Sequence, residues 1–382
     1  FMDYLKDTQM VSTFSLEKQM LLINDLSGVI VTNAEVYPGE DVGSSNFAIA
    51  TSPTNKYSGY GILDNYGSRY TGEYRLSAGA NINSVSKVGD TLSFNGMVSN
   101  TANLKNIATN YKRAIGYSGL NASINASTTR YKLDKIDNYE GFGTSNSLGF
   151  GLSYPLVKTR SHTQEVSMDF AYKNIDDSSG TPGLVDESEK SIYSLTLGLS
   201  DKRNTNILDK SGKLYSKISF TTGNVNMDNS VAKTNDILID TKGSYSKANL
   251  YISHNQLFNP KLSLQTTLNA QKSFGKNLDS SEDISVGGTN GVRAYEDSEL
   301  SGDQGVSLSL ELIYALPKYN YMNQYASLFV DSAKVWKNSK KFNSEDNIRS
   351  LNAFGLGYNI YYKNFDCKTS FAHGFGSSST PL

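Results

Sequence analysis

The residue types that perform most enzyme chemistry are few and scattered in this sequence. The three histidines, His162, His254 and His373, lie far apart along the chain, and no i, i+4 pair or cysteine cluster accompanies them. The single cysteine cannot form an intrachain disulfide or a thiolate-rich metal site. We therefore expect no catalytic residues, no metal ligands and no cofactor.

Glycine-rich and acidic stretches are equally poor candidates for a reactive site. Gly287-Gly288-Thr289-Asn290-Gly291 lacks the Gly-Lys-Ser/Thr ending and the following helix that phosphate binding requires. Acidic pairs such as Asp176 with Asp177 and Glu282 with Asp283 lie in polar stretches and are more often solvated charge than catalytic or calcium-binding groups. Lys+Arg total 36 against Asp+Glu 37, a net charge of -1 that supplies no positive field for phosphates. This balance excludes a nucleic-acid-binding protein, and we do not expect an enzyme.

The elements around these residues follow a period of two from about residue 57 onward. Tyr70 to Ile82 alternates in this way, and the clearest segment sets Val306, Leu308, Leu310 and Leu312 against Ser307, Ser309 and Glu311. We count roughly fifteen such segments, most of them about 10 to 15 residues long. Strands in soluble sheets are usually about half that length.

The composition of the two strand faces predicts a membrane barrel. No run of about 18 apolar residues is present, and the mean hydropathy is -0.42, which excludes a helical membrane protein. One face is apolar and uncharged, whereas the other mixes small polar residues with Glu73, Arg75, Asp169, Lys173 and Asp331. Such a face suits a hydrated lumen, and strands that cross hydrocarbon must close on themselves. A soluble β-sandwich or β-helix is the less favoured alternative.

Connections between the segments alternate in length, as in outer-membrane barrels. Short ones such as Arg160 to Thr163 and Asn259 to Lys261 are followed by long polar ones. We expect long loops at Asp176 to Lys190, Asn226 to Lys242, Gly275 to Asp303 and Asn338 to Ile348. The loop 275–303 exceeds the usual length and holds Arg293 between apolar neighbours, with Asp331 a suitable partner for a guanidinium. Composition alone favours a solvated arginine over that pairing.

Residues 1–52 read differently from the rest of the chain. Apolar residues at helical spacing predict a short helix over Leu16 to Leu26, with Ser15 as N-cap and Gly28 as the stop. Val29 to Tyr37 and Asn46 to Thr51 fit two short strands joined as a hairpin. This pattern predicts a small α+β module, and its first residues lack the features of a signal peptide.

Four segments, in this order, resemble the outer-membrane transporters of two-partner secretion, the haemolysin-activation and filamentous-haemagglutinin-secretion family. They are Leu16 to Val29 followed by Tyr37-Pro38-Gly39; the signature Asp64, Asn65, Gly67, Ser68, Thr71 and Gly72; the loop motif Val292-Arg293-Ala294-Tyr295; and the strand motif Phe329-Val330-Asp331-Ser332-Ala333. Ala294 and Ala333 stand where the family usually has glycine. The likeness spans nearly the whole chain.

The resemblance implies an all-β transmembrane barrel, 16-stranded in the family, over residues 57–382, with the last strand missing here. Phe365 to Phe375 would be the penultimate strand and Ser377 to Leu382 the loop after it. Residues 1–52 would be the C-terminal part of a second polypeptide-transport-associated (POTRA) domain, so the chain reads as a fragment truncated at both ends. The sixth extracellular loop would enter the lumen, where Arg293 would pair with Asp331 and, with Tyr295, set the conformation of the barrel.

The function implied by the resemblance is export of one large partner exoprotein, an adhesin, haemolysin or contact-dependent toxin, without nucleotide hydrolysis. Localisation would be the outer membrane of a Gram-negative bacterium, with the POTRA part in the periplasm. Partners would be the N-terminal secretion domain of the exoprotein, outer-membrane lipid and lipopolysaccharide. Two alternatives stay open: an insertase of the barrel-assembly type and a diffusion porin, although residues 1–52 argue against a porin.

Overall fold

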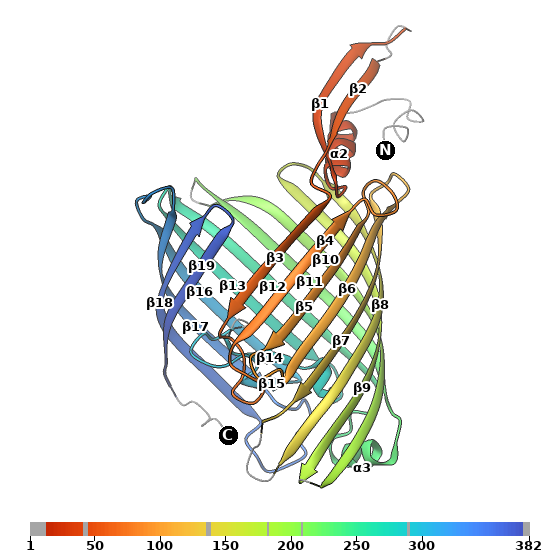
Figure 1. The fold of residues 1–382 in the computed structure, drawn as a ribbon, viewed down its shortest axis with the longest axis vertical. Helices are drawn as coiled ribbons and strands as arrows, with labels where there is room; N and C mark the ends of the chain where they lie inside the picture. Colours follow the sequence, from red (N-terminus) through yellow and green to blue (C-terminus); the bar gives the residue numbers. More distant parts are fainter. Residues whose placement is uncertain are drawn as a thin grey trace.

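A computed structural model describes residues 13–40, 45–134, 139–181, 183–207, 209–288 and 291–376. Fifteen strands form one sheet in which neighbours along the chain pair antiparallel, from β3 at one edge to β19 at the other (Figure 1). The strands are β3 (Tyr57–Asp64), β4 (Arg75–Asn83), β5 (Thr91–Ser99), β6 (Leu104–Ile115), β7 (Leu120–Lys132), β8 (Glu140–Lys158), β9 (His162–Thr181), β10 (Leu184–Ile207), β11 (Lys210–Met227), β12 (Gly243–Asn259), β13 (Leu262–Ser273), β16 (Gln304–Ala315), β17 (Asn323–Trp336), β18 (Ile348–Tyr362) and β19 (Phe365–Gly374). No helix among the described residues is long and apolar enough to cross a membrane.

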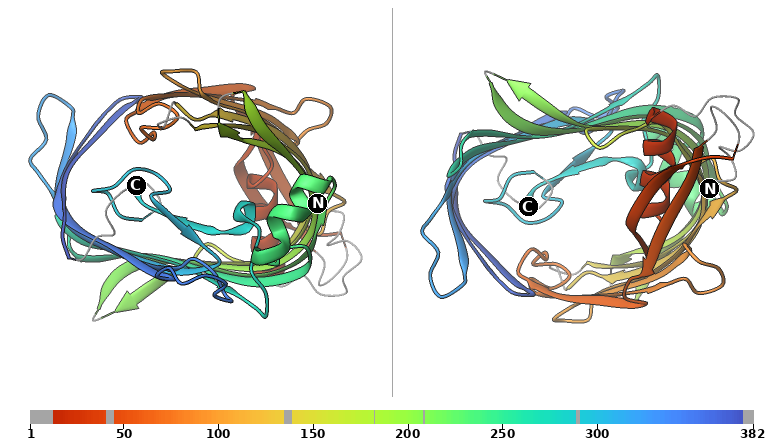
Figure 2. Two further views of the ribbon diagram at one scale, coloured as in Figure 1. Left: turned by 90° about the horizontal axis from the view of Figure 1, so that it is seen from below. Right: turned by 90° about the horizontal axis from the view of Figure 1, so that it is seen from above.

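The sheet curls into a ring when it is seen along its axis (Figure 2). Within the described ranges, no backbone ladder joins β3 to β19, so the ring has two unpaired edges. The segment Ser377 to Leu382, which we interpreted as a loop, lies outside the described residues.

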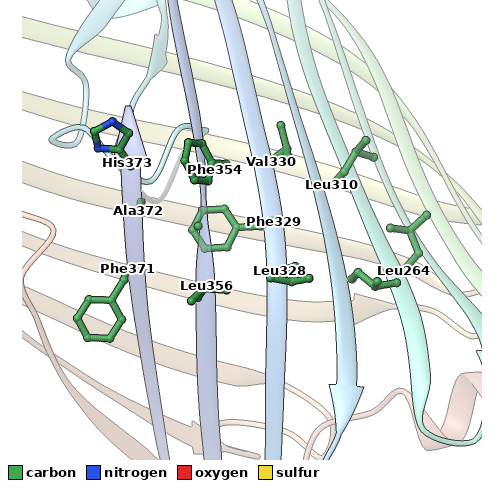
Figure 3. Close-up of a pocket in the computed structure, with 12 residues that line it drawn as sticks. Leu264, Leu310, Leu328, Phe329, Val330, Phe354, Leu356, Phe371, Ala372 and His373 are labelled. Carbon is green, nitrogen blue, oxygen red and sulfur yellow. The ribbon is translucent and has the colours of Figure 1, made fainter. Parts of the chain in front are cut away.

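Side chains alternate between the outside and the inside of the ring. Leu308, Leu310 and Leu312 of β16 are 36 to 40% exposed on the outer face, whereas Ser307 is buried. Figure 3 shows the same outer surface over five neighbouring strands, where Leu264, Leu310, Leu328, Leu356 and Phe371 lie in rows. The apolar rows therefore lie on the outer surface and do not form a hydrophobic core inside the ring. The polar residues line the interior of the ring.

Two expectations about local structure were wrong. The segment Asp176 to Lys190 is not a long loop, because β9 and β10 continue through it in register, with Asp176 opposite Glu189. Polar residues can extend a hairpin because the ladder is held by backbone hydrogen bonds. Tyr70 is not in a strand either: residues 65–74 form a compact turn, and β4 begins at Arg75.

The N-terminal module stands on one rim of the ring, which we call the near rim (Figure 1). It consists of α2 (Thr13–Asn24) and the antiparallel hairpin of β1 (Val29–Pro38) and β2 (Ser45–Pro53). Helix α2 is attached to turns of the near rim: Lys158 Nζ lies 2.5 Å from Asp25 Oδ2, and a β-bridge joins Ser27 to Gly89. The long connections, including α3 (Ser230–Ile239), lie at the opposite, far rim.

Candidate functional site

The connection between β13 and β16 folds into the interior of the ring, as both views of Figure 2 show. It contains a short 3-10 helix, η1 (Ser280–Glu282), and two short paired strands, β14 (Ile284–Val286) and β15 (Leu300–Gly302). Counted along the far rim, it is the sixth connection. An apolar cluster of its Ile284, Val286, Val292 and Leu300 with Ala333, Val335, Leu351 and Ala353 of β17 and β18 seats it on the wall. Hydrophobic burial therefore holds the loop inside.

Two glycines shape the tip of this loop. Gly287 and Gly288 have φ of +125° and +55°, and the Gly288 N–H donates to the Val292 carbonyl over 3.0 Å. A Cβ at Gly287 would lie 2.3 Å from the Glu296 carbonyl oxygen, and one at Gly288 would lie 2.1 Å from Asp297 Oδ1. The glycines are needed because the returning chain passes too close for a side chain. Thr289 and Asn290, the other part of the glycine-rich stretch, lie outside the described residues.

Arg293 lies at the centre of a polar cluster on β16 and β17. Its Nε and Nη2 donate to the two carboxylate oxygens of Asp331 over 2.9 and 3.0 Å. Its Nη1 donates to Glu311 Oε2 over 2.7 Å, and its Nη2 also donates to Ser309 Oγ over 3.2 Å. The guanidinium carbon lies 3.4 Å from the centroid of the Phe329 ring. Two parallel hydrogen bonds, a second carboxylate and an aromatic face together suit arginine and not lysine.

The electrostatics of this cluster keep the arginine charged. Burial alone lowers the pKa of Arg293, but the hydrogen bonds and charges of Asp331 and Glu311 outweigh it and raise that pKa. Asp331 is fully buried, and its Oδ2 also accepts the backbone N–H of Arg293 over 3.1 Å. Removal of the guanidinium would therefore leave a buried carboxylate without its counter-charge.

The other residues of the two motifs pack around Arg293. Val292 is fully buried in the apolar cluster, and Ala294 and Tyr295 pack against that cluster. The Tyr295 ring also lies close to the edge strand β19, because a Cβ at Gly374 would be 2.7 Å from the Tyr295 hydroxyl oxygen. Ala333, where the family usually has glycine, is 2% exposed in the same cluster, so its methyl group fits there.

The signature residues build the compact turn between β3 and β4. Asp64 Oδ1 accepts the Tyr66 N–H over 3.0 Å, and Ser68 accepts the N–H groups of Thr71 and Gly72. Gly72 has φ of +113°, and a Cβ at Gly67 would lie 2.0 Å from the Gly72 carbonyl oxygen. Asn65 is exposed. The signature thus fixes the backbone of this turn and does not itself contact Arg293.

Ion pairs that sequence reasoning missed join this turn to the loop tip. Arg69 Nε lies 3.0 Å from Glu296 Oε1, and the Arg69 N–H donates to Glu296 Oε2 over 3.1 Å. Arg75 bridges two carboxylates, with Nε 2.8 Å from Asp64 and Nη1 2.8 Å from Asp297. Arg75 was recognised only as an inward-facing charge of the polar face. The one sequence signal for these ion pairs was the acidic pair Glu296 and Asp297, directly after the loop motif.

A second ionic cluster holds the base of the loop, and it corrects the expectation that Glu282 is solvated, because Glu282 is buried between two lysines. Lys173 Nζ and Lys247 Nζ lie 2.6 and 2.9 Å from the two oxygens of Glu282, and Lys190 Nζ lies 2.8 Å from Asp279 Oδ2. Burial would raise the pKa of Glu282, but the charges of Lys247 and Lys173 lower it. We call Lys173, Lys190, Lys247, Asp279 and Glu282 the base cluster. It ties the loop to β9, β10 and β12.

The last strand of the loop runs beside the end of β17, which carries the only tryptophan of the sequence, Trp336. A Cβ at Gly302 would lie 2.4 Å from the Trp336 carbonyl oxygen, and the Asp303 N–H donates to the Lys337 carbonyl over 3.2 Å. Lys334 Nζ lies 5.3 Å from the Trp336 ring. The loop base and the end of β17 are therefore in close contact.

Two neighbouring carboxyl groups, the half-buried Asp283 and the buried Asp303, lead us to expect that the loop base is sensitive to pH. Burial, together with the nearby charges of Asp303 and Asp279, raises the pKa of Asp283 from 3.8 to about 8, although Lys247 opposes the shift. A raised pKa means that the docked loop gains stability below the ordinary pKa and loses it as pH rises towards 8. We expect protease cleavage of the loop to become at least about tenfold faster between pH 5 and 9.

An Asp283→Asn variant should remove most of this dependence, because the amide carries no proton to lose. The measurement is the rate of cleavage in the loop by a protease that is active across the range. Asp346→Asn, at an exposed position in the next connection of the far rim, is the control and should keep the wild-type profile. A pH profile that is unchanged by Asp283→Asn would contradict the assignment.

Comparisons with known proteins agree with this architecture. A family model described as haemolysin secretion/activation protein ShlB/FhaC/HecB matches residues 43–360. The heme/hemopexin transporter protein HuxB of Haemophilus influenzae is 30% identical over 329 residues, which are 85% of this chain and 57% of HuxB. The chain thus spans little more than half the length of that relative.

Solved structures of other proteins share the fold. CdiB from Escherichia coli superposes with a TM-score of 0.73 at 20% identity, over 94% of this chain and 66% of CdiB. CdiB from Acinetobacter baumannii gives 0.69 at 17% identity, over 98% and 70%. BamA from Haemophilus ducreyi gives 0.63 at 15% identity, over 96% and 75%. At these identities the likeness concerns the fold alone.

Proposed function

Because the chain belongs to the haemolysin secretion/activation family ShlB/FhaC/HecB, we propose that it exports one large partner exoprotein through the interior of its ring. The protein is located in the outer membrane of a Gram-negative bacterium. Its family is one of secretion transporters and not of enzymes, and we propose that export proceeds without nucleotide hydrolysis. The cargo would be an adhesin, a haemolysin or a contact-dependent toxin.

The observation that carries this proposal is the polar interior crossed by a docked loop. An extended polypeptide needs hydrogen-bonding partners and water along its path, and the inward face offers serine, threonine, asparagine and charged groups. The loop lies in that path and is tied to the wall by Arg293, Asp331 and Glu311. We propose that Arg293 and Tyr295, with Asp331 and Phe329, set the conformation of this loop and thereby of the passage.

We propose further that residues 57–382 contribute the fifteen described strands to a closed barrel of 16 strands. The physical support is the pair of unpaired edges, β3 and β19, because backbone N–H and C=O groups must be paired in hydrocarbon. The exposed leucine, phenylalanine and tyrosine rows would contact outer-membrane lipid and, on the outer leaflet, lipopolysaccharide.

Residues 1–52 are proposed to be the C-terminal part of a periplasmic POTRA domain. Helix α2 and the β1–β2 hairpin agree with a module of that kind, and the hairpin leaves both of its outer strand edges unpaired within the described residues. We propose that the secretion domain of the exoprotein adds a strand there by β-augmentation. A diffusion porin would not need the module formed by residues 1–52. Membership of a secretion family does not favour an insertase.

The test of this function is export of a large exoprotein, which we expect to find encoded next to this chain. Cells that produce the full-length transporter and the exoprotein should release the latter or display it at the surface. Cells that lack the transporter should retain it in the periplasm, while the amounts of other outer-membrane proteins stay normal. A general loss of outer-membrane proteins would instead indicate an insertase, and unchanged export would reject the proposal.

A further inference from the structure

Three cations lie together at the far-rim ends of the neighbouring strands β6 and β7 (Figure 1). Lys105 is directly opposite Arg130 in the antiparallel ladder, and Lys132 follows Arg130 by two residues on the same face. Ile107 of the apolar outer surface, 64% exposed, is two residues from Lys105, so all three cations point to the outside of the ring. All three are exposed, and we call them the rim cations.

The rim cations have no counter-charge among the described residues. None of them forms an ion pair or a side-chain hydrogen bond with the part of the chain that the structure describes. Asp134 instead accepts a hydrogen bond from Asn103 over 2.5 Å, and Glu140 lies diagonal to Lys132 without pairing with it. Asp176 is two strands away from β7. Like charges directly opposite each other destabilise a sheet, so this arrangement costs stability unless an anion neutralises it.

The position of the rim cations is the end of the apolar outer surface. Towards the near rim, Ile107, Ile124 and Leu148 of β6, β7 and β8 are all more than half exposed. Strands rise about 3.3 Å per residue, so this apolar surface begins within about 7 Å of the rim cations. In the proposed orientation the near rim faces the periplasm, and the rim cations therefore lie at the headgroups of the outer leaflet.

From this position we infer that Lys105, Arg130 and Lys132 form a binding site for the phosphorylated lipid A headgroup of lipopolysaccharide. The inference rests on the proposed orientation and deepens the proposed contact with lipid. One lipid A molecule offers phosphates to the rim cations and acyl chains to the apolar surface below them. The chain as a whole carries a net charge of -1, but screening confines the effect of distant charges to about 8 Å at physiological salt.

The chemistry of three adjacent cations favours lipid A over a phospholipid. A phosphate monoester carries about 1.5 to 2 negative charges at pH 7, whereas the phosphodiester of a phospholipid carries one. The guanidinium of Arg130 can donate two parallel hydrogen bonds to one phosphate, and the ammonium groups of Lys105 and Lys132 add mobile point charges. Such a site is matched by the more highly charged headgroup.

The test measures binding of isolated lipid A to the full-length protein, so its result depends neither on export nor on an exoprotein. The protein is purified in a non-ionic detergent, freed of lipopolysaccharide and titrated with bisphosphorylated lipid A, and native mass spectrometry counts the bound molecules. Lys105→Gln/Arg130→Gln/Lys132→Gln should bind lipid A at least about tenfold more weakly, because cations near a membrane surface each attract anionic headgroups. Equal affinities of parent and variant would overturn the inference.

A matched variant and two other ligands separate this site from general attraction between charges. Arg113→Gln/Lys210→Gln/Lys213→Gln removes the same charge from the near-rim ends of β6 and β11 and should keep the parent affinity. Dephosphorylated lipid A and phosphatidylglycerol should bind the parent at least about tenfold more weakly than lipid A. A similar loss in the near-rim variant, or equal binding of either ligand, would overturn the site.

Two further measurements keep the test decisive if the triple variant does not assemble. Lys105→Arg/Lys132→Arg keeps the charges and should bind lipid A as the parent does. Binding by the parent should weaken at least about fivefold when the salt concentration is raised from about 0.05 to 0.5 M, because salt screens exposed charges. Affinity that does not depend on salt, or displacement of lipid A by millimolar inorganic phosphate, would overturn the inference.

Discussion

An Arg293→Gln variant should lose export of the exoprotein almost completely while the barrel still assembles. The substitution leaves Asp331 fully buried beside Glu311 with no counter-charge. Breaking a buried ion pair from one side costs about 3 to 5 kcal/mol, and every 1.4 kcal/mol is about a factor of ten in an equilibrium. The equilibrium constant for docking of the loop should therefore fall by about two orders of magnitude or more.

The measurement combines two assays on the same cells. Exoprotein in the medium or at the surface reports export, and the heat-dependent shift in gel mobility of the transporter reports barrel assembly. Arg113→Gln, at the near-rim end of β6 and away from the loop, is the control and should export normally. Arg293→Lys should also fail, because an ammonium cannot bond both oxygens of Asp331 and reach Glu311 at once. Normal export by Arg293→Gln would discard the proposed role.

A Glu282→Gln variant should release the base of the loop even though the tip is untouched. Glu282 is 5% exposed and holds both Lys173 and Lys247, so the amide leaves two ammonium groups in the interior without their carboxylate. We expect a loss of about 3 kcal/mol or more in docking. Protease cleavage of the loop should then become at least about a hundredfold faster.

Acidification offers an independent check on the same contact. The lowered pKa of Glu282 means that its contribution is present above the ordinary glutamate pKa and disappears as pH falls below it. The wild-type loop should lose this contribution at acidic pH, whereas the Glu282→Gln loop has none to lose. Glu345→Gln, in an exposed pair with Lys337, should change the cleavage rate less than about threefold. Equal rates in Glu282→Gln and the wild type would contradict the role of the base cluster.

The sheet could be predicted from the sequence because each strand has an apolar face towards lipid and a polar face towards water. This arrangement imposes a period of two on the sequence. Leu308, Leu310 and Leu312 read as one face and lie on one face. The resemblance to the two-partner secretion family is confirmed by the family match. The hairpin of β9 and β10 was mispredicted because beyond the membrane both faces are polar, so the alternation vanishes while the ladder continues.

The ionic contacts of the loop were harder to foresee for a different reason. The Arg69–Glu296 pair joins residues 227 positions apart, and the Lys173–Glu282 pair joins residues 109 apart. Local patterns contain no information about which inward-facing charges meet after the sheet has curled. The Arg293–Asp331 pairing was anticipated only because two family motifs pointed to it, and its functional role stays a prediction.

The position of Trp336 gives the protein an optical reporter of its outer surface. It is the only indole in the sequence, and only its backbone carbonyl lies against the loop, at Gly302. Its side chain lies on the same face of β17 as Lys334, opposite Ala333 and Val335, which pack against the loop. Indole emission responds to the polarity of its surroundings, so transfer of the protein from detergent into lipid vesicles should shift the colour of that light.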